Sequence, residues 1–271
     1  MILRAFIRSV IFVALTLLTQ IGGLVYLAVL IFAKIFGWKD KLVIYVVFII
    51  AYTGASFTTS YIAPMFGRYP IPCLVSQTAT LKIAHPIYCA LNRHYINADI
   101  LVLLEKAADA VDAKFASTQT LVLDANFPFL NGFPLLPHLS HHDGRKVDLA
   151  FYYKDEKDAY LKGVMKSPIG YWGYTQPPKG SALPCDNFNN SLLLRWDFDF
   201  LQGALPQYEL ELKRTAFLLN WLTTEGRQYG LEKILLEPHI KLRLGLKSDL
   251  IRFQGCRAAR HDDHIHLQVG G

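Results

Sequence analysis

Two long apolar runs dominate the first quarter of the chain, at residues 6–36 and 42–63. Each is long enough to supply the roughly 20 residues that a helix needs to cross a hydrocarbon core of about 30 Å. Neither run keeps the polar face that a helix of a soluble protein presents to water. The first run is too long for the apolar part of a cleaved signal peptide, and no clear small-residue cleavage site closes it. The pattern predicts a membrane anchor of two transmembrane helices over residues 1–64.

Behind the anchor, four prolines between residues 64 and 86 predict an irregular connector over residues 65–97. From there on, residues 98–116 and 208–230 carry apolar side chains at the helical period of about 3.6 residues. Short apolar runs predict strands at 120–127, 147–153, 231–238 and 264–269. This mixed order indicates an α+β domain over residues 98–271, with flanking helices and a small, mainly antiparallel sheet.

The formal net charge is +6, and it is spread along the chain without a basic tract. Nucleic-acid binding usually needs clustered Lys and Arg, so this distribution disfavours a nucleic-acid partner. A positive protein can instead work beside an anionic membrane or an anionic wall polymer. The sequence gives no indication of the oligomeric state.

Basic residues flank both ends of the predicted hairpin. Three lysines surround its short loop, and two arginines lie near the N-terminus: Lys34, Lys39, Lys41, Arg4 and Arg8. Cytoplasmic loops carry the excess of Lys and Arg, so the lysines favour a cytoplasmic loop. Because both ends of a hairpin lie on one side of the membrane, this orientation places everything after residue 64 outside. Arg4 and Arg8 favour the opposite orientation, because in a hairpin the N-terminus lies on the same side of the membrane as the residues after 64.

All four cysteines follow the anchor: Cys73, Cys89, Cys185 and Cys256. None makes a CxxC pair, which argues against a thiolate zinc site. Their even number is compatible with two disulfides in an oxidising compartment. Free buried thiols are an equal alternative, and the pairing stays open.

Six of the nine histidines fall into two short windows. The first, PHLSHHDGRKVDLAF, holds His138, His141, His142 and Asp148. The second, RHDDHIHLQV, holds His261, His264 and His266. A His-x-His pair alone is more often a surface pair of a strand, but two such windows in one chain indicate a shared site.

The spacing within the windows favours a metal. Residues two apart in a strand point to the same face, so His264 and His266 can converge on one ion or on its bound water. Gly144 lets its loop fold back, so that His141 and Asp148 aim at a common point. Two imidazoles and one carboxylate leave the fourth position of a catalytic zinc ion (Zn²⁺) open for water.

Several other polar and aromatic residues lie near these windows. Three carboxylates could orient ligating imidazoles, and we expect at least two of them to be solvated instead: Asp143, Asp262 and Asp263. We expect His142 to point away from the site and His239 to lie at the surface. Aromatic residues of the loop at 170–178 are expected to anchor that loop in the core, with a role beside a substrate groove as the alternative.

The arrangement resembles a known family of zinc peptidases. Ser140, His141, Gly144 and Asp148, with His138 three residues before His141, resemble the first metal motif of the LAS metallopeptidases. This group comprises lysostaphin, the D-Ala-D-Ala metallopeptidases and hedgehog. The final His-x-x-His-x-His is similar to their last motif, and the similarity is greatest to the penicillin-insensitive murein endopeptidases.

The resemblance implies a role for each of these side chains. The zinc ligands would be His141, Asp148 and His266. His138 would lie at the edge of the metal site or at a second metal position. His264 would be the catalytic histidine beside the bound water, assisted by His261.

By the same resemblance, the chain would be a zinc peptidase or amidase that cuts peptide cross-links of peptidoglycan. Its anchor would place it in a bacterial inner membrane, with the catalytic domain in the periplasm or outside the cell. Family members are secreted through a cleaved signal, so the anchor is a departure from the family pattern. Two alternatives stay open: a non-catalytic membrane protein whose zinc domain binds wall peptide or a partner, and a zinc peptidase with a non-murein substrate.

Overall fold

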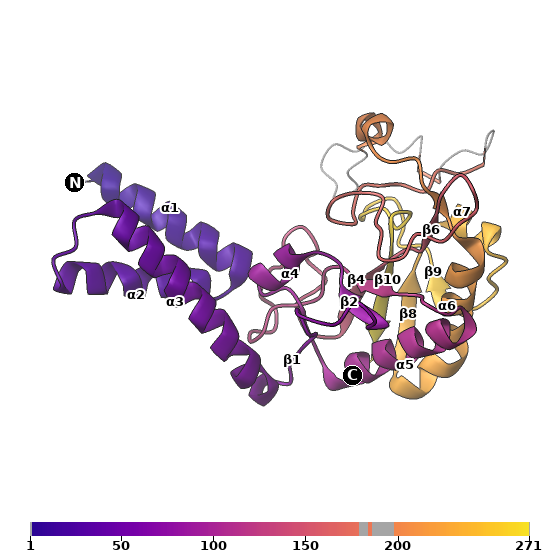
Figure 1. The fold of residues 1–271 in the computed structure, drawn as a ribbon, viewed down its shortest axis with the longest axis horizontal. Coiled ribbons are helices and arrows are strands. Elements are labelled where there is room, and N and C mark those ends of the chain that lie inside the picture. Colours follow the sequence, from indigo (N-terminus) through magenta and orange to yellow (C-terminus); the bar gives the residue numbers. More distant parts are fainter. Residues whose placement is uncertain (1, 179–183, 186–197, 271) are drawn as a thin grey trace.

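The computed structural model describes residues 2–178, 184–185 and 198–270, and it shows a bundle of three helices beside an α+β domain (Figure 1). The bundle consists of α1 (Ile2–Thr19), α2 (Gly22–Ile35) and α3 (Lys41–Ile62). Consecutive helices pack against each other and run antiparallel, so the N-terminus lies at the end remote from the α+β domain. Two stretches, α1 and Lys41–Phe66, are long and apolar enough to cross a membrane.

The expected single helix over residues 6–36 was wrong. Gln20 takes a left-handed φ of +66° directly after α1, which ends that helix. The hydroxyl oxygen of Thr19 then accepts the N–H of Gly22 at 2.8 Å, where α2 begins. A helix of 14 residues is about 21 Å long, so α2 runs back along α1 without crossing a full hydrocarbon core. The signal of this reversal in the sequence is Gln20 followed by Gly22 and Gly23, because a polar residue and a Gly-Gly pair interrupt the apolar run there.

Polar contacts fix the inner end of the bundle to the α+β domain. The side-chain oxygen of Gln20 accepts the backbone N–H of Phe129 at 2.9 Å. The hydroxyl of Tyr52 donates to the carbonyl of Ala90 at 2.6 Å, and it accepts the side-chain amide of Asn92 at 3.1 Å. The break between α1 and α2 is therefore part of the contact with the domain.

A six-stranded sheet forms the centre of the α+β domain, in the order β2–β4–β5–β10–β8–β9. Its strands are β2 (Leu81–Ile83), β4 (Thr120–Val122), β5 (Lys146–Ala150), β10 (His264–Val269), β8 (Leu231–Leu235) and β9 (Ile251–Arg252). The inner pairings are antiparallel and the two edge pairings are parallel. The α+β class is confirmed, and the sheet is mixed.

Two helices, α5 (Ala98–Lys114) and α6 (Leu212–Thr224), pack side by side and share one apolar core with the sheet. Both lie within the ranges expected from the sequence. The side chain of Asn97 caps α5 by accepting the N–H of Ile100 at 3.0 Å. The shorter elements are β1 (Tyr69–Pro70), α4 (Pro86–Ala90), β3 (Tyr95–Ile96), β6 (Tyr153–Lys154), β7 (Glu209–Leu210), α7 (Pro238–Arg243) and the 3₁₀ turns Ala63–Phe66, Asp199–Ala204 and Glu225–Tyr229.

The expected connector over residues 65–97 takes part in this fold. Its strand β2 pairs with β4 at the edge of the main sheet. One disulfide joins Cys73 to Cys89, and the other joins Cys185 to Cys256. All four cysteines are therefore paired, which decides between disulfides and free thiols.

Candidate metal centre

Two neighbouring strands supply the first side chains of the site. β5 and β10 pair antiparallel, with His266 directly opposite Asp148. Facing residues of an antiparallel pair carry their side chains on the same face of the sheet. His264 lies two residues before His266 in β10 and shares that face, as the sequence predicts.

The loop before β5 supplies the third side chain, His141. Gly144 in this loop has a left-handed φ of +81°, which glycine adopts without steric cost. Its N–H donates to the side-chain oxygen of Asn126 at 3.0 Å. A Cβ at this position would lie 2.3 Å from Nη1 of Arg68, so a larger residue would require the Arg68 side chain to move. The glycine folds the loop back toward Asp148, which confirms its expected role.

His141, Asp148 and His266 form a buried group whose ligand atoms all lie within 4.8 Å of one another. Nε2 of His141 is 3.1 Å from Nδ1 of His266 and 3.4 Å from Oδ1 of Asp148. Nδ1 of His266 is 2.9 Å from the same carboxylate oxygen. Tetrahedral zinc with bonds of about 2.0–2.2 Å separates its ligand atoms by about 3.3–3.6 Å. The donor set therefore fits a zinc ion after shifts of a few tenths of an ångström.

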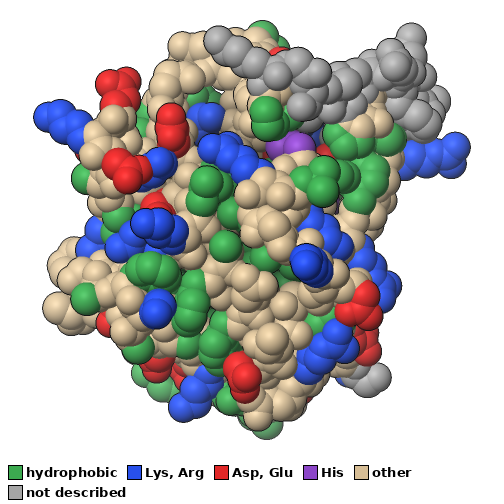
Figure 2. Space-filling model, turned by 90° about the vertical axis from the view of Figure 1, so that its right-hand side faces the viewer, with side chains coloured by type: hydrophobic (Ala, Val, Ile, Leu, Met, Phe, Trp, Pro, Cys, Tyr) green, Lys and Arg blue, Asp and Glu red, His purple; other side chains and the backbone are tan. Residues whose placement is uncertain are grey.

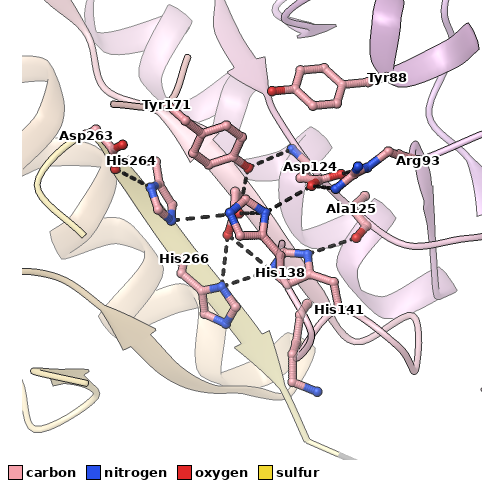
Figure 3. Close-up of polar contacts among 12 residues, drawn as sticks. Tyr88, Arg93, Asp124, Ala125, His138, His141, Tyr171, Asp263, His264 and His266 are labelled. Carbon is pink, nitrogen blue, oxygen red and sulfur yellow. Dashed lines mark hydrogen bonds and ion pairs between the residues drawn. The ribbon is translucent and has the colours of Figure 1, made fainter. Parts of the chain in front are cut away.

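Hydrogen bonds around the group fix how its side chains face the site (Figure 3). Nδ1–H of His141 donates to the carbonyl of Ala125 at 2.8 Å, which leaves Nε2 with its lone pair toward the group. The hydroxyl of Tyr171 donates to Oδ2 of Asp148 at 2.7 Å. Both contacts orient a ligand independently of any bound metal.

Burial and neighbouring charges shift the pKa values of the ligand group in opposite directions. Burial raises the pKa of Asp148, but the imidazoles of His141 and His264 outweigh it and hold that pKa well below its usual range. Burial lowers the pKa of His266 to about 4, so this imidazole is neutral at pH 7. Burial also lowers the pKa of His141, yet the Asp148 carboxylate raises it above the ordinary value. An ionised carboxylate and a neutral imidazole are the forms that bind metals.

His264 stands beside the ligand group with a carboxylate partner of its own. Its Nδ1 donates to Asp263, which also accepts the backbone N–H of Trp172. Its Nε2 lies 3.8 Å from Oδ2 of Asp148. Burial lowers the pKa of His264, but Asp148 and Asp263 overcome this effect and raise it to about 9. The side chain can therefore hold a proton next to the candidate metal position.

His261 is buried against the same group, with its ring centroid 4.9 Å from that of His264. Within the described part of the chain, its Nδ1 has no hydrogen-bond partner. Burial and the neighbouring imidazoles of His264 and His266 hold its pKa well below the ordinary value. His261 is therefore a neutral imidazole facing the cavity that His264 also lines.

His138 lies at the edge of the ligand group. Its Nδ1 is 2.9 Å from Oδ2 of Asp124 and 3.5 Å from Oδ2 of Asp148. Asp124 in turn forms an ion pair with the buried guanidinium of Arg93. Sequence reasoning missed Asp124 and Arg93, because neither lies in a histidine window. The signal that could have found Asp124 is a lone carboxylate at the end of the apolar strand TLVLD.

The three carboxylates beside the histidines have different surroundings. Asp263 accepts Nδ1–H of His264 and orients that imidazole, which is the role that the sequence allows for these carboxylates. Asp262 is fully buried in an ion pair with Arg260. Asp143 is partly exposed and binds the lysine three residues on. The expectation that at least two of them are solvated was wrong, because a charged partner allows a carboxylate to be buried.

Three remaining expectations concern neighbours of the site. His142 lies outside the metal group, and its carbonyl accepts the N–H of Gly132. His239 is buried rather than exposed, with Nε2 2.8 Å from the carbonyl of Thr175. In the aromatic loop, Tyr171 is both buried and in contact with Asp148, so it anchors the loop and belongs to the site.

Adjoining cavities surround the site and meet at His138. One, of about 150 Å³, is lined by the metal group together with His261 and His264. Another, of about 120 Å³, is largely apolar and lined by residues that include Ile87 and Leu91. On the face of the domain shown in Figure 2, histidine atoms are visible among hydrophobic and basic side chains.

Comparison with known proteins adds no relative to this picture. No protein-family profile matches the chain, and no curated protein sequence matches it. The functional interpretation therefore depends on the residues and their geometry, together with the motif resemblance described above.

Proposed function

We propose that the protein is a membrane-anchored zinc hydrolase that cleaves a peptide or amide bond, with cross-links of peptidoglycan as its substrate. The observation that carries the proposal is the buried group of His141, Asp148 and His266, whose spacing suits a divalent metal and which contains an ionised carboxylate and a neutral His266. These three side chains would hold the ion. When bound, zinc would polarise the scissile carbonyl and lower the pKa of its water toward about 7.

His264 would be the general base. Its Nε2 faces the ligand group, while its Nδ1–H is held by Asp263. A carboxylate behind the imidazole stabilises the imidazolium that forms when Nε2 accepts a proton. The same proton can then be delivered from Nε2 to the leaving amine. Burial lowers the pKa of His264, but without a metal the Asp148 and Asp263 carboxylates raise it to about 9; a cation held by Asp148 would offset the effect of that carboxylate and favour the neutral base.

His261 would assist through a hydrogen bond rather than through charge. Its pKa is held well below the ordinary value, so the imidazole stays neutral and keeps one N–H to donate. This N–H would stabilise the oxygen on which negative charge develops during attack on the carbonyl.

The choice of substrate and compartment is supported by three features. The motif resemblance points to enzymes of the murein layer. Both disulfides lie behind the anchor, as expected of a domain in an oxidising compartment such as the periplasm. The apolar helices α1 and α3 would keep the hydrolase domain close to the membrane surface.

The deciding experiment uses the full-length protein, purified in detergent and loaded with zinc. Cross-linked peptidoglycan fragments are added, and the amines released by cleavage are quantified and assigned by mass spectrometry. Turnover that is lost in His266→Ala together with the bound zinc, and retained in His142→Ala, supports the proposal. His142 is the matched control because it is a histidine of the same loop outside the metal group.

The other outcomes would replace the proposal. Zinc binding and retention of wall fragments without turnover would indicate a non-catalytic binding protein. Cleavage of unrelated peptides but not of wall fragments would indicate a zinc peptidase with a different substrate. Full activity of His266→Ala on wall fragments would eliminate the metal mechanism.

A further inference from the structure

The helical bundle contains a cavity of about 640 Å³ at the end remote from the α+β domain. Side chains from α1, α2, α3 and the loop between α2 and α3 line it. Its charged lining residues are Arg4, Arg8, Lys39 and Lys41. The proposed hydrolase uses none of them, since the metal centre lies in the other part of the molecule (Figure 1).

The charge at this end of the bundle is not neutralised by the protein. Residues 1–64 contain five basic side chains and a single carboxylate, Asp40. That carboxylate accepts the N–H of Leu42 at 2.8 Å and so caps the start of α3. Among the ion pairs of residues 2–178, 184–185 and 198–270, none involves the four basic residues of the cavity.

The rest of the cavity wall is apolar and aromatic. Ile11, Leu30 and Ile44 line it together with Trp38, which comes from the loop. Tryptophan is enriched at the membrane–water interface, where one side of the ring meets lipid and the other meets water. Cations beside an aromatic residue and an apolar wall match a lipid whose headgroup is anionic and whose chains are apolar.

We propose that this cavity binds the headgroup phosphate of an anionic phospholipid. The four cations would surround the phosphate, and the first acyl carbons would lie along Ile11 and Ile44. The break at Gln20 makes this possible, because it returns the chain and brings the N-terminal arginines to the same end as the loop lysines. Basic residues at one end of a bundle favour the cytoplasmic leaflet, so the lipid would be bound there and residues 65–270 would lie outside.

The full-length protein would be tested in detergent with phosphatidylglycerol and phosphatidylcholine of equal chain length. Native mass spectrometry would count the lipids that remain bound. Wild type is expected to bind phosphatidylglycerol at least tenfold more tightly, with the preference decreasing as salt is raised. Equal binding of the two lipids by the wild type would overturn the proposal without any variant.

Variants would then locate the site. Replacing Arg4, Arg8, Lys39 and Lys41 by Gln should remove the preference for phosphatidylglycerol. The matched control removes the same charge from exposed lysines of the α+β domain, as Lys106→Gln, Lys114→Gln, Lys213→Gln and Lys247→Gln, and should keep the preference. A preference that survives in the first variant, or is lost in the control, would contradict the assignment. Circular dichroism and thermal unfolding measured in parallel verify that both variants are folded, so the result depends neither on metal binding nor on hydrolase activity.

Discussion

The two carboxylate oxygens of Asp148 face different sets of side chains. Oδ1 faces His141 and His266, at 3.4 and 2.9 Å. Oδ2 accepts the hydroxyl of Tyr171 and faces His138 and His264, at 3.5 and 3.8 Å. One carboxylate thus separates a compact ligand group from a second, looser group of imidazoles.

The difference between the two sides lies in what supports each imidazole. On the Oδ2 side, His138 and His264 each contact a further carboxylate, from Asp124 and Asp263. On the Oδ1 side, Nδ1 of His141 meets only a backbone carbonyl. The Asp263 carboxylate helps to raise the pKa of His264, whereas the Ala125 carbonyl accepts Nδ1–H of His141 and leaves Nε2 directed toward the ligand group. In the proposed function, the Oδ1 side would hold the metal and His264 on the Oδ2 side would transfer protons.

The largest effect on zinc binding and turnover is expected from Asp148→Asn. Asparagine has nearly the same shape but lacks the negative charge that faces the imidazoles on both sides. Loss of a zinc ligand should lower zinc affinity by more than the roughly 10–100-fold cost of removing a supporting contact. Turnover should fall to background. Zinc content after dialysis and amine release from wall fragments measure the two effects. Retained zinc in this variant would contradict the ligand assignment, and His142→Ala is the unaffected control.

His264→Gln should separate the two sides. The variant loses the base on the Oδ2 side but leaves the ligand group intact, so kcat should fall by about 10²–10⁴-fold while zinc stays bound. Zinc stoichiometry and steady-state kinetics show whether His264 acts as a base or as a metal ligand. If zinc and activity disappeared together, His264 would be a ligand and the division at Asp148 would fail. His239→Gln, at a buried histidine outside the metal group, is the control.

In the metal-free protein, His264 and His266 should contribute to the free energy of unfolding in different pH ranges. The folded pKa of His264, about 9, exceeds its unfolded value of about 6.5. Its contribution is therefore fully present below pH 6.5 and is lost as the pH rises through 9. The folded pKa of His266, about 4, lies below its unfolded value, so its contribution is present above pH 6.5 and is lost as the pH falls through 4.

Each of these contributions is on the order of 3 kcal/mol, from a shift between about 6.5 and the folded value. Thermal unfolding of the full-length protein in detergent with chelator, followed over a series of pH values, would measure them. His264→Gln should flatten the alkaline decline, and His266→Gln should flatten the acidic one. Identical pH profiles of both variants would remove the distinction between the two sides.

The smallest effect on zinc binding is expected from Tyr171→Phe. This change removes the hydroxyl that donates to Oδ2 of Asp148 and keeps the aromatic ring. Zinc affinity should fall by about 10–100-fold, as for other groups that orient a ligand. Zinc titration against a competing chelator measures the change. Tyr160→Phe removes a hydroxyl that donates to the carbonyl of Gln119, remote from the ligand group, and should change nothing. Equal affinity of wild type and Tyr171→Phe would show that Asp148 needs no such support.

Much of the site could be anticipated because its residues are close in sequence and follow strand periodicity. The His264 and His266 pair on one face follows from the alternation of a strand. Gly144 was correctly expected to turn its loop, because the spacing between His141 and Asp148 requires a reversal. The sequence offers only a carboxylate at the end of TLVLD for Asp124 and an aromatic loop for Tyr171, and neither signal shows which side chains of the site they contact. Their roles arise from strand pairing and loop packing.

The sequence by itself determined the apolar length of the anchor, the α+β class and the two histidine windows, because these depend on local periodicity and side-chain chemistry. The tertiary structure decided that the first apolar run turns back at Gln20, that His266 stands opposite Asp148, and that the cysteines pair. It also decided which side of Asp148 each imidazole occupies. These features depend on contacts between residues far apart in the chain, and a local pattern carries no information about such distances.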